Sequence, residues 1–278
     1  MMRSSLLGLA LACAVSVLPG AAGAQEIALG AKAPDFVLPA ALPQLSPECR
    51  SRRVAGELFR RPLRGLSRAV RSNRTVRILA IGSSSTVGTG ASSPSATYVA
   101  RLEKDLEGSV KGMDFDVVGR GVGGEVAQGA ADRMKKEVEE TKPDLVVWQV
   151  GTNDALRHVE VDKFKSCLKN TLAWLIERRI DVVLVDPQFG EELAKDAHYE
   201  KMVHAVAEVA REAHVLLVDR YEAMRELQKE RGDTFYLTRD NLHMNDRGYR
   251  CMAEQLARGI VGGLLQADGE QKRPVFEP

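Results

Sequence analysis

The sequence predicts a three-layer α/β/α sandwich built on a five-stranded, parallel, doubly wound sheet. From Val76 onward, short runs rich in Val, Ile and Leu alternate with longer stretches of helical periodicity, and the connections are short. The short runs are apolar throughout, which is typical of strands that are buried on both faces of a parallel sheet. Right-handed crossovers between successive strands would then place helices on both faces.

Each predicted strand is too short for a helix and rich in β-branched residues; the ranges are 76–81, 114–118, 144–150, 180–186 and 214–218. Helices are expected at 96–107, 125–141, 160–178, 195–212, 221–230 and 246–263. The domain therefore covers residues 75–265. The polar, proline-ended residues 266–278 predict a flexible tail.

Residues 1–24 have the pattern of a secretory signal peptide. Arg3 precedes an apolar run from Leu6 to Leu18, and a stretch of small residues ends at Ala24. The run is shorter than the ~20 apolar residues of a membrane-spanning helix. A buried N-terminal helix is the alternative. We expect an exported protein, periplasmic or secreted, whose mature chain begins at Gln25 and which has no membrane span.

Residues 25–74 are expected to form an extension before the domain. Prolines exclude a long helix up to about residue 47, but a short amphipathic helix is predicted to begin near Pro62. Its apolar stripe would dock on the domain, while Arg60, Arg64 and Arg68 recur on the other side. These arginines either form a solvated face or bind an anionic glycan or lipid head group through their guanidinium groups.

Three cysteines remain after removal of the signal peptide: Cys49, Cys167 and Cys251. An exported protein can form disulfides, and an odd number leaves one thiol over. Pairing of Cys49 with either Cys167 or Cys251 is open, and so is a role for each as a small buried hydrophobic residue.

Composition excludes several classes of partner. The chain has 278 residues, 44% hydrophobic and 28% charged, with a formal net charge of +1. These values are ordinary for a globular protein and give no bias toward nucleic acid. The histidines at 158, 198, 204 and 214 show no ligand spacing, so no metal is expected. Gly119 to Gly124 is not followed by a strand with a ribose-binding acid, so no dinucleotide or other cofactor is expected.

Small and polar residues follow the predicted strands at their carboxyl ends. The first strand leads into Gly82-Ser-Ser-Ser-Thr-Val-Gly88, the second into residues 119–125 and the third into Gly151-Thr-Asn-Asp154. Asp240 and His243 precede the last helix, at a spacing that lets a carboxylate orient an imidazole. Because the carboxyl ends of parallel strands share one edge, these segments predict a site there.

Together these segments resemble the SGNH hydrolases, also called GDSL esterases and lipases, over residues 75–263. Gly82, Ser84, Thr86 and Gly88 fit the first block of that family, Gly-Asp-Ser-x-(Ser/Thr)-x-Gly. The resemblance implies a flavodoxin-like fold and assigns the following roles: Ser84 as nucleophile, Gly124 and Asn153 as oxyanion donors, and Asp240 and His243 as the rest of a triad.

Two positions depart from the family pattern. Ser83 stands where the family usually has Asp, and Gly119 stands where the second block often has Asn. Both are next to assigned positions, so they affect local hydrogen bonding and substrate choice more than the reaction. The third block of the family, Gly-x-Asn-Asp, is present as residues 151–154. Of the residues beside it, Trp148 is expected in the core, Gln149 near substrate, and Arg157 and His158 on a loop that could contact an acyl or sugar group.

The resemblance implies a carboxylic ester hydrolase that works through a covalent serine ester. Export, the lack of a large apolar lid insertion and the 5% aromatic content favour removal of acetyl or another short acyl group from an envelope or extracellular carbohydrate. An acyltransferase, lysophospholipase or thioesterase with the same triad remains open. The alternative of another class is a non-catalytic glycan-binding module.

Overall fold

The structure, a computed structural model, describes residues 36–51, 61–72, 75–232 and 236–271. All of them belong to the compact unit Pro34–Pro278. The predicted signal peptide and Arg60 lie outside the described residues.

The predicted sheet is confirmed: it has five strands, all parallel, in the order β2-β1-β3-β4-β5. The strands are β1 (Val76–Gly82), β2 (Phe115–Gly121), β3 (Leu145–Gln149), β4 (Asp181–Val185) and β5 (Leu216–Val218). The chain moves from β1 outward to β2, and then returns to the other side of β1 for β3. Loops that leave the carboxyl ends of β1 and β3 therefore flank the point where the strand order reverses, which is where sheets of this kind bind ligands.

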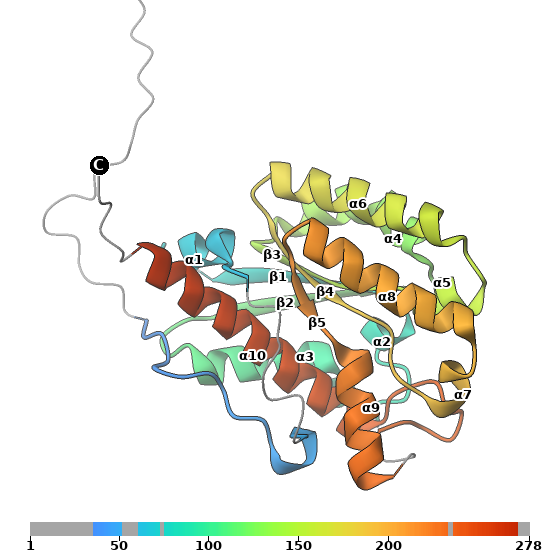
Figure 1. The fold of residues 1–278 in the computed structure, drawn as a ribbon. Coiled ribbons are helices and arrows are strands. Elements are labelled where there is room, and N and C mark those ends of the chain that lie inside the picture. Colours follow the sequence, from blue (N-terminus) through green and yellow to red (C-terminus); the bar gives the residue numbers. More distant parts are fainter. Residues whose placement is uncertain (1–35, 52–60, 73–74, 233–235, 272–278) are drawn as a thin grey trace, which may run out of the picture. The chain divides into compact units, whose positions relative to one another are not determined.

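Helices cover both faces of the sheet (Figure 1). One layer contains α1, α3 and α10, and the other contains α4, α6 and α8. The helices are α1 (Arg64–Arg71), α2 (Ser84–Val87), α3 (Tyr98–Ser109), α4 (Ala127–Thr141), α5 (Thr152–Leu156), α6 (Val161–Glu177), α7 (Glu191–Ala194), α8 (Ala197–Glu212), α9 (Arg220–Arg231) and α10 (Asp246–Gln271). Two short 3-10 helices are η1 (Pro47–Cys49) and η2 (Pro94–Ala96). No helix in these described ranges combines the length and apolarity needed to cross a bilayer.

The central strands are apolar because both of their faces are covered. Every residue of β3 is buried, and Trp148, expected in the core, is fully buried there. Strand β2 is longer than predicted and ends at Gly121, because its last residues pair in register with the end of β1. Gly119 is thus part of the strand and not of the turn that follows.

Helix α1 forms as predicted, but it packs into the same core as the sheet. Leu66 and Val70 are buried, and Asp181 of β4 accepts a hydrogen bond from the Leu66 N–H at 2.9 Å. The opposite side carries the arginines. Arg64 pairs with Glu270 at 3.0 Å, whereas Arg68 lines an open hollow of about 350 Å³.

Helix α10 extends to Gln271, so residues 266–271 are helical and the prediction that they belong to a flexible tail is wrong. Ala267 and Asp268 are buried. Asp268 also pairs with Arg71 of α1. Contacts with α1 therefore stabilise the last turns of α10, which the sequence of α10 alone does not show.

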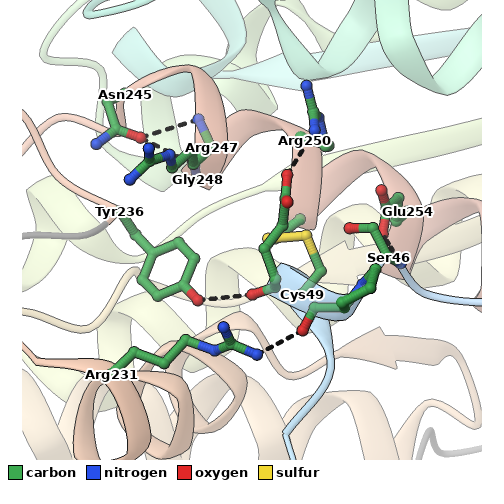
Figure 2. Close-up of a disulfide and its surroundings, with 12 residues drawn as sticks. Ser46, Cys49, Arg231, Tyr236, Asn245, Arg247, Gly248, Arg250 and Glu254 are labelled. Atoms are coloured by element: carbon green, nitrogen blue, oxygen red, sulfur yellow. Dashed lines mark hydrogen bonds and ion pairs between the residues drawn. A yellow bond between two sulfur atoms is a disulfide. The ribbon is translucent and has the colours of Figure 1, made fainter.

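A disulfide between Cys49 and Cys251 joins the extension to α10, across a sequence separation of 202 residues (Figure 2). Around it, Arg250 forms an ion pair with Glu48, and the Tyr236 hydroxyl donates to the Glu48 carbonyl at 2.7 Å. Cys167 keeps a free thiol. The disulfide thus lies beside the loop that leads into α10.

Candidate active site

Ser84 lies directly beyond the carboxyl end of β1. It is the first residue of the one-turn helix α2, so its N–H has no partner within the helix. The turn ends at Gly88, which has φ of 94° and donates its N–H to the Ser84 carbonyl at 3.0 Å. This positive φ requires glycine, and the tight turn lifts Ser84 out of the sheet edge.

Asp240 and His243 lie in the loop before α10. Oδ2 of Asp240 is 2.6 Å from Nδ1 of His243. The other carboxylate oxygen accepts hydrogen bonds from the N–H groups of His243 and Leu242 and from the Thr238 hydroxyl, at 2.9, 3.0 and 2.6 Å. The turn itself fixes the orientation of this carboxylate toward the ring.

The second ring nitrogen of His243 faces the nucleophile. Nε2 is 3.1 Å from Oγ of Ser84, although the two residues are 159 positions apart in sequence. The His243 side chain is 20% exposed and the Asp240 side chain 50% exposed. Ser84, His243 and Asp240 therefore form a continuous hydrogen-bonded relay that is open to solvent at its acid end.

Asp240 stays ionised in this arrangement. Burial raises its pKa, but hydrogen bonds from the Thr238 hydroxyl, the His243 ring and two backbone N–H groups outweigh that effect. The net result is a pKa well below the ordinary value of an aspartate. A permanent negative charge thus lies against Nδ1 of His243.

Gly124 lies in the turn after β2 and has φ of 73°. Within the described ranges, its N–H and that of Ser84 are not donated to a backbone acceptor. Glu125, the next residue, forms a two-pronged ion pair with Arg133 of α4, with N to O distances of 2.8 and 2.7 Å. This pair anchors the turn that presents the Gly124 N–H.

Asn153 lies at the start of α5, after β3. Its Nδ2 donates one hydrogen bond to the Glu125 carbonyl, at 2.9 Å. An amide nitrogen carries two hydrogens, so one remains for another acceptor. The bond between Asn153 and Glu125 links the second and third blocks.

Asp154 supports the start of helix α4. It is buried, and its carboxylate accepts the N–H of Ala127 at the start of α4, at 3.0 and 3.1 Å. Burial raises the pKa of Asp154 to about 6, although this backbone hydrogen bond opposes the change.

Two contacts join the nucleophile segment to the start of α10. The Tyr249 hydroxyl donates to the Thr89 carbonyl at 2.7 Å, and the Ser92 N–H donates to Asp246 at 2.8 Å. These two contacts therefore tie the segment after Ser84 to the segment after His243.

The structure corrects one expectation beside the site. Gln149 is buried, and its Oε1 accepts hydrogen bonds from the Ser83 N–H and hydroxyl at 3.0 and 3.1 Å, so it does not face substrate. Ser83 itself is buried by this contact. No sequence pattern marks Thr238 as a partner of Asp240, because a hydroxyl two residues before an acid is not distinctive.

The two residues expected on the neighbouring loop differ in their surroundings. A Cβ atom at Gly124 would lie only 3.3 Å from the Arg157 guanidinium, so Arg157 lies beside the second block. His158 instead stacks on His198 and pairs with Asp196 at 3.3 Å. Of these two, only Arg157 is placed at the candidate site by an observed contact.

Among the residues that the structure describes, no three His, Cys, Asp or Glu side chains are grouped as metal ligands. The chemistry that the side chains themselves offer is a nucleophilic hydroxyl, a base held by a carboxylate, and nearby N–H donors.

Comparison with known proteins gives the same fold and a family. Residues 49–266 match the non-GDSL lipase-like family. No significant sequence match was found among curated proteins. Among solved structures, TesA is 23% identical with a TM-score of 0.58, over 66% of this chain and 97% of TesA. The acetyl xylan esterase AlAXEase is 26% identical with a TM-score of 0.56, over 65% and 98% of the two chains. An acetyl xylan esterase from Geobacillus stearothermophilus is 22% identical with a TM-score of 0.58, over 68% and 96%.

Proposed function

The chain belongs to the non-GDSL lipase-like family and is an ester hydrolase of the SGNH type, and from that membership we propose a specific reaction. Ser84 attacks the ester, and the enzyme removes acetyl or another short acyl group from an envelope or extracellular carbohydrate. The observation that supports this proposal best is the relay from Ser84 through His243 to Asp240, with heavy-atom distances of 3.1 and 2.6 Å.

In the first half of the reaction, His243 Nε2 takes the proton of Ser84 Oγ as Oγ attacks the ester carbonyl carbon. Asp240 holds the ring with Nδ1 protonated and stabilises the imidazolium that forms. When the tetrahedral intermediate collapses, the bond to the alcohol breaks and His243 gives its proton to the leaving oxygen. The acyl group is then held as an ester of Ser84.

In the second half, water takes the place of the alcohol. His243 accepts a proton from the water as its oxygen attacks the acyl carbon, and collapse returns the proton to Ser84 Oγ. The products are the carboxylic acid and the free enzyme. A sugar hydroxyl in place of water would transfer the acyl group by the same steps.

The negative charge on the carbonyl oxygen requires donors. We assign this role to the N–H groups of Ser84 and Gly124 and to the remaining Asn153 amide hydrogen. Among the described residues, neither N–H group is donated to a backbone acceptor, and Asn153 is held against Glu125. Each such donor is typically worth about 10²–10³ in rate.

The surroundings of the relay support a short acyl group on a polar alcohol. Val87, Val122 and Leu156 lie within three positions of assigned residues in the sequence and are 53, 47 and 42% exposed. We assign these exposed apolar residues to contact with a short acyl chain. Arg157 beside Gly124 offers hydrogen-bond donors to sugar oxygens. The similar solved structures include esterases named for acetyl xylan and one active on acetylated mannans.

Export is supported by two features. Residues 1–24 have the signal-peptide pattern. The Cys49–Cys251 disulfide fits an oxidising compartment such as the periplasm or the exterior.

The proposal is tested by hydrolysis of p-nitrophenyl esters from acetate to octanoate and of acetylated xylan, by the wild type and Ser84→Ala. We expect turnover that is greatest for acetate or propionate, extends to the polysaccharide and disappears in the variant. Preference for octanoate would refute the short-acyl assignment. If Ser84→Ala hydrolysed the esters at the wild-type rate, the assignment of Ser84 as the nucleophile would be refuted.

A further inference from the structure

Gln188 lies in the loop after β4, outside the segments that carry the assigned residues, and is 3% exposed. Its amide makes contacts in three directions. Oε1 accepts hydrogen bonds from the Thr152 hydroxyl at 2.8 Å and from Nη2 of Arg220 at 3.0 Å. Nε2 donates to the Leu242 carbonyl at 3.0 Å.

Arg220 extends this set of contacts to the nucleophile. It is the first residue of α9 and is 1% exposed. Its Nη1 donates to the Ser85 hydroxyl at 3.3 Å. Its Nε donates to the Asp186 carbonyl at 3.0 Å, and its N–H donates to the Asp186 carboxylate at 2.6 Å. Arg220 is therefore held both at its backbone N–H and at its guanidinium group.

Three of the residues that Gln188 and Arg220 contact lie next to an assigned residue in the sequence. Ser85 follows Ser84, Thr152 precedes Asn153, and Leu242 precedes His243. One amide, together with one guanidinium, thus contacts the sequence neighbour of the nucleophile, of the side-chain oxyanion donor and of the base.

A packing role alone does not require these groups, because an apolar side chain fills buried space without the cost of desolvating an amide or a cation. A buried polar network that is satisfied instead fixes the directions of its members. The amide of Gln188 is planar, so its partners are fixed relative to one another. The Tyr199 hydroxyl also donates a hydrogen bond to the backbone carbonyl of Gln188, at 2.7 Å.

We propose that Gln188 is a positioning residue for hydrolysis: its amide, acting together with Arg220, holds the loops of Ser84, Asn153 and His243 in their mutual placement. This inference rests on the proposed function, since it concerns the same relay. Catalysis needs such control, because a misplacement of about 1 Å at reacting groups can cost about 100-fold in rate. The 3.1 Å contact between Ser84 and His243 depends on loops that are far apart in sequence.

Gln188→Glu isolates one arm of this network. The carboxylate has the shape of the amide and still accepts from Thr152 and Arg220, but, ionised beside Arg220, it cannot donate to the Leu242 carbonyl. Thr152→Val removes a different arm with little change in shape. Thr171→Val is the matched control, because its hydroxyl donates within α6 to the Cys167 carbonyl at 2.9 Å.

We expect kcat on p-nitrophenyl acetate to fall about 10–100-fold in Gln188→Glu and less in Thr152→Val, with KM changed less than about twofold. Thr171→Val keeps the wild-type kcat. Thermal unfolding of each variant separates this effect from a general loss of stability. A folded Gln188→Glu with wild-type kcat would overturn the inference.

Crystal structures of the wild type and Gln188→Glu provide a readout that does not depend on turnover. The inference predicts that the distance from Ser84 Oγ to His243 Nε2 lengthens beyond 3.5 Å in the variant. An unchanged distance would overturn it even if neither protein hydrolyses an ester. Absence of wild-type turnover together with a lengthened distance would instead refute the proposed function and leave the positioning role supported.

Discussion

The Asp240 carboxylate and the His243 ring meet at 2.6 Å within a single turn, and the Thr238 hydroxyl holds the other carboxylate oxygen at 2.6 Å. Hydrogen bonds overcome the effect of burial and keep the pKa of Asp240 below its ordinary value. The acid of the relay is thus charged throughout the neutral and mildly acidic range.

The first prediction concerns the pH dependence of activity. Because Asp240 stays ionised below pH 3.8, it does not titrate where an ester hydrolase is assayed. We expect the acid limb of the pH profile to follow a single ionisation, so that the logarithm of kcat/KM rises with pH with a slope of one. A slope of two between pH 4 and 7 would contradict the charge state assigned to Asp240.

The same pKa shift has a consequence for stability. A depressed carboxyl pKa adds stability above the unfolded value of 3.8, and that stability is lost as pH falls through the folded value. Asp240→Asn should therefore melt below the wild type at pH 7, with a difference that shrinks below pH 4. The variant should also lose about 10³–10⁴-fold in kcat, because Asn favours the wrong ring tautomer.

Asn153→Ala tests the oxyanion site. We expect kcat to fall about 10²–10³-fold with little change in KM, because the amide would contact the oxygen mainly after charge develops. The melting temperature is measured beside the kinetics, since the variant also loses the bond to the Glu125 carbonyl. A rise in KM with unchanged kcat would assign Asn153 to substrate binding instead.

Asp154 predicts a pH dependence of the opposite sign. Burial raises its pKa to about 6, so the folded protein keeps a proton that the unfolded chain releases between about pH 4 and 6. Stability from this group is present below pH 4 and is lost as pH rises through 6. Relative to Asp154→Asn, the wild type should lose up to about 3 kcal/mol between pH 4 and 7. A constant difference in chemical denaturation would refute this.

The disulfide predicts a redox-dependent stability. Cys49→Ser with Cys251→Ser should lower the free energy of unfolding by about 2–5 kcal/mol, because the bond closes a loop of 202 residues in the unfolded chain. Cys167→Ser is the control, since that thiol is free. Reductant should destabilise the wild type and the control but not the double variant. Equal sensitivity of all three proteins would argue against the Cys49–Cys251 pairing.

The sequence was most informative where chemistry depends on a few consecutive residues. The turn of Ser84 follows an apolar strand, and Asp240 lies three residues before His243, so both patterns are local. The parallel sheet was predictable for a similar reason, because strands buried on both faces are apolar along their length. These features require no knowledge of distant contacts.

The remaining features depend on contacts between distant segments. Gln188 is 36 positions from Thr152 and 54 from Leu242, so no spacing in the chain marks it. Gln149 was expected near substrate, but its partner is Ser83, on a neighbouring strand's loop, 66 positions away. The end of α10 depends in the same way on arginines of α1.

The central claim is that Ser84, among three consecutive serines, is the activated nucleophile. The most direct measurement is labelling with a fluorophosphonate, followed by peptide mapping of the wild type, Ser83→Ala and Ser84→Ala. The relay predicts one adduct, on Ser84, in the wild type and Ser83→Ala and none in Ser84→Ala. An adduct on Ser83 or Ser85, or no labelling of folded wild-type protein, would contradict it.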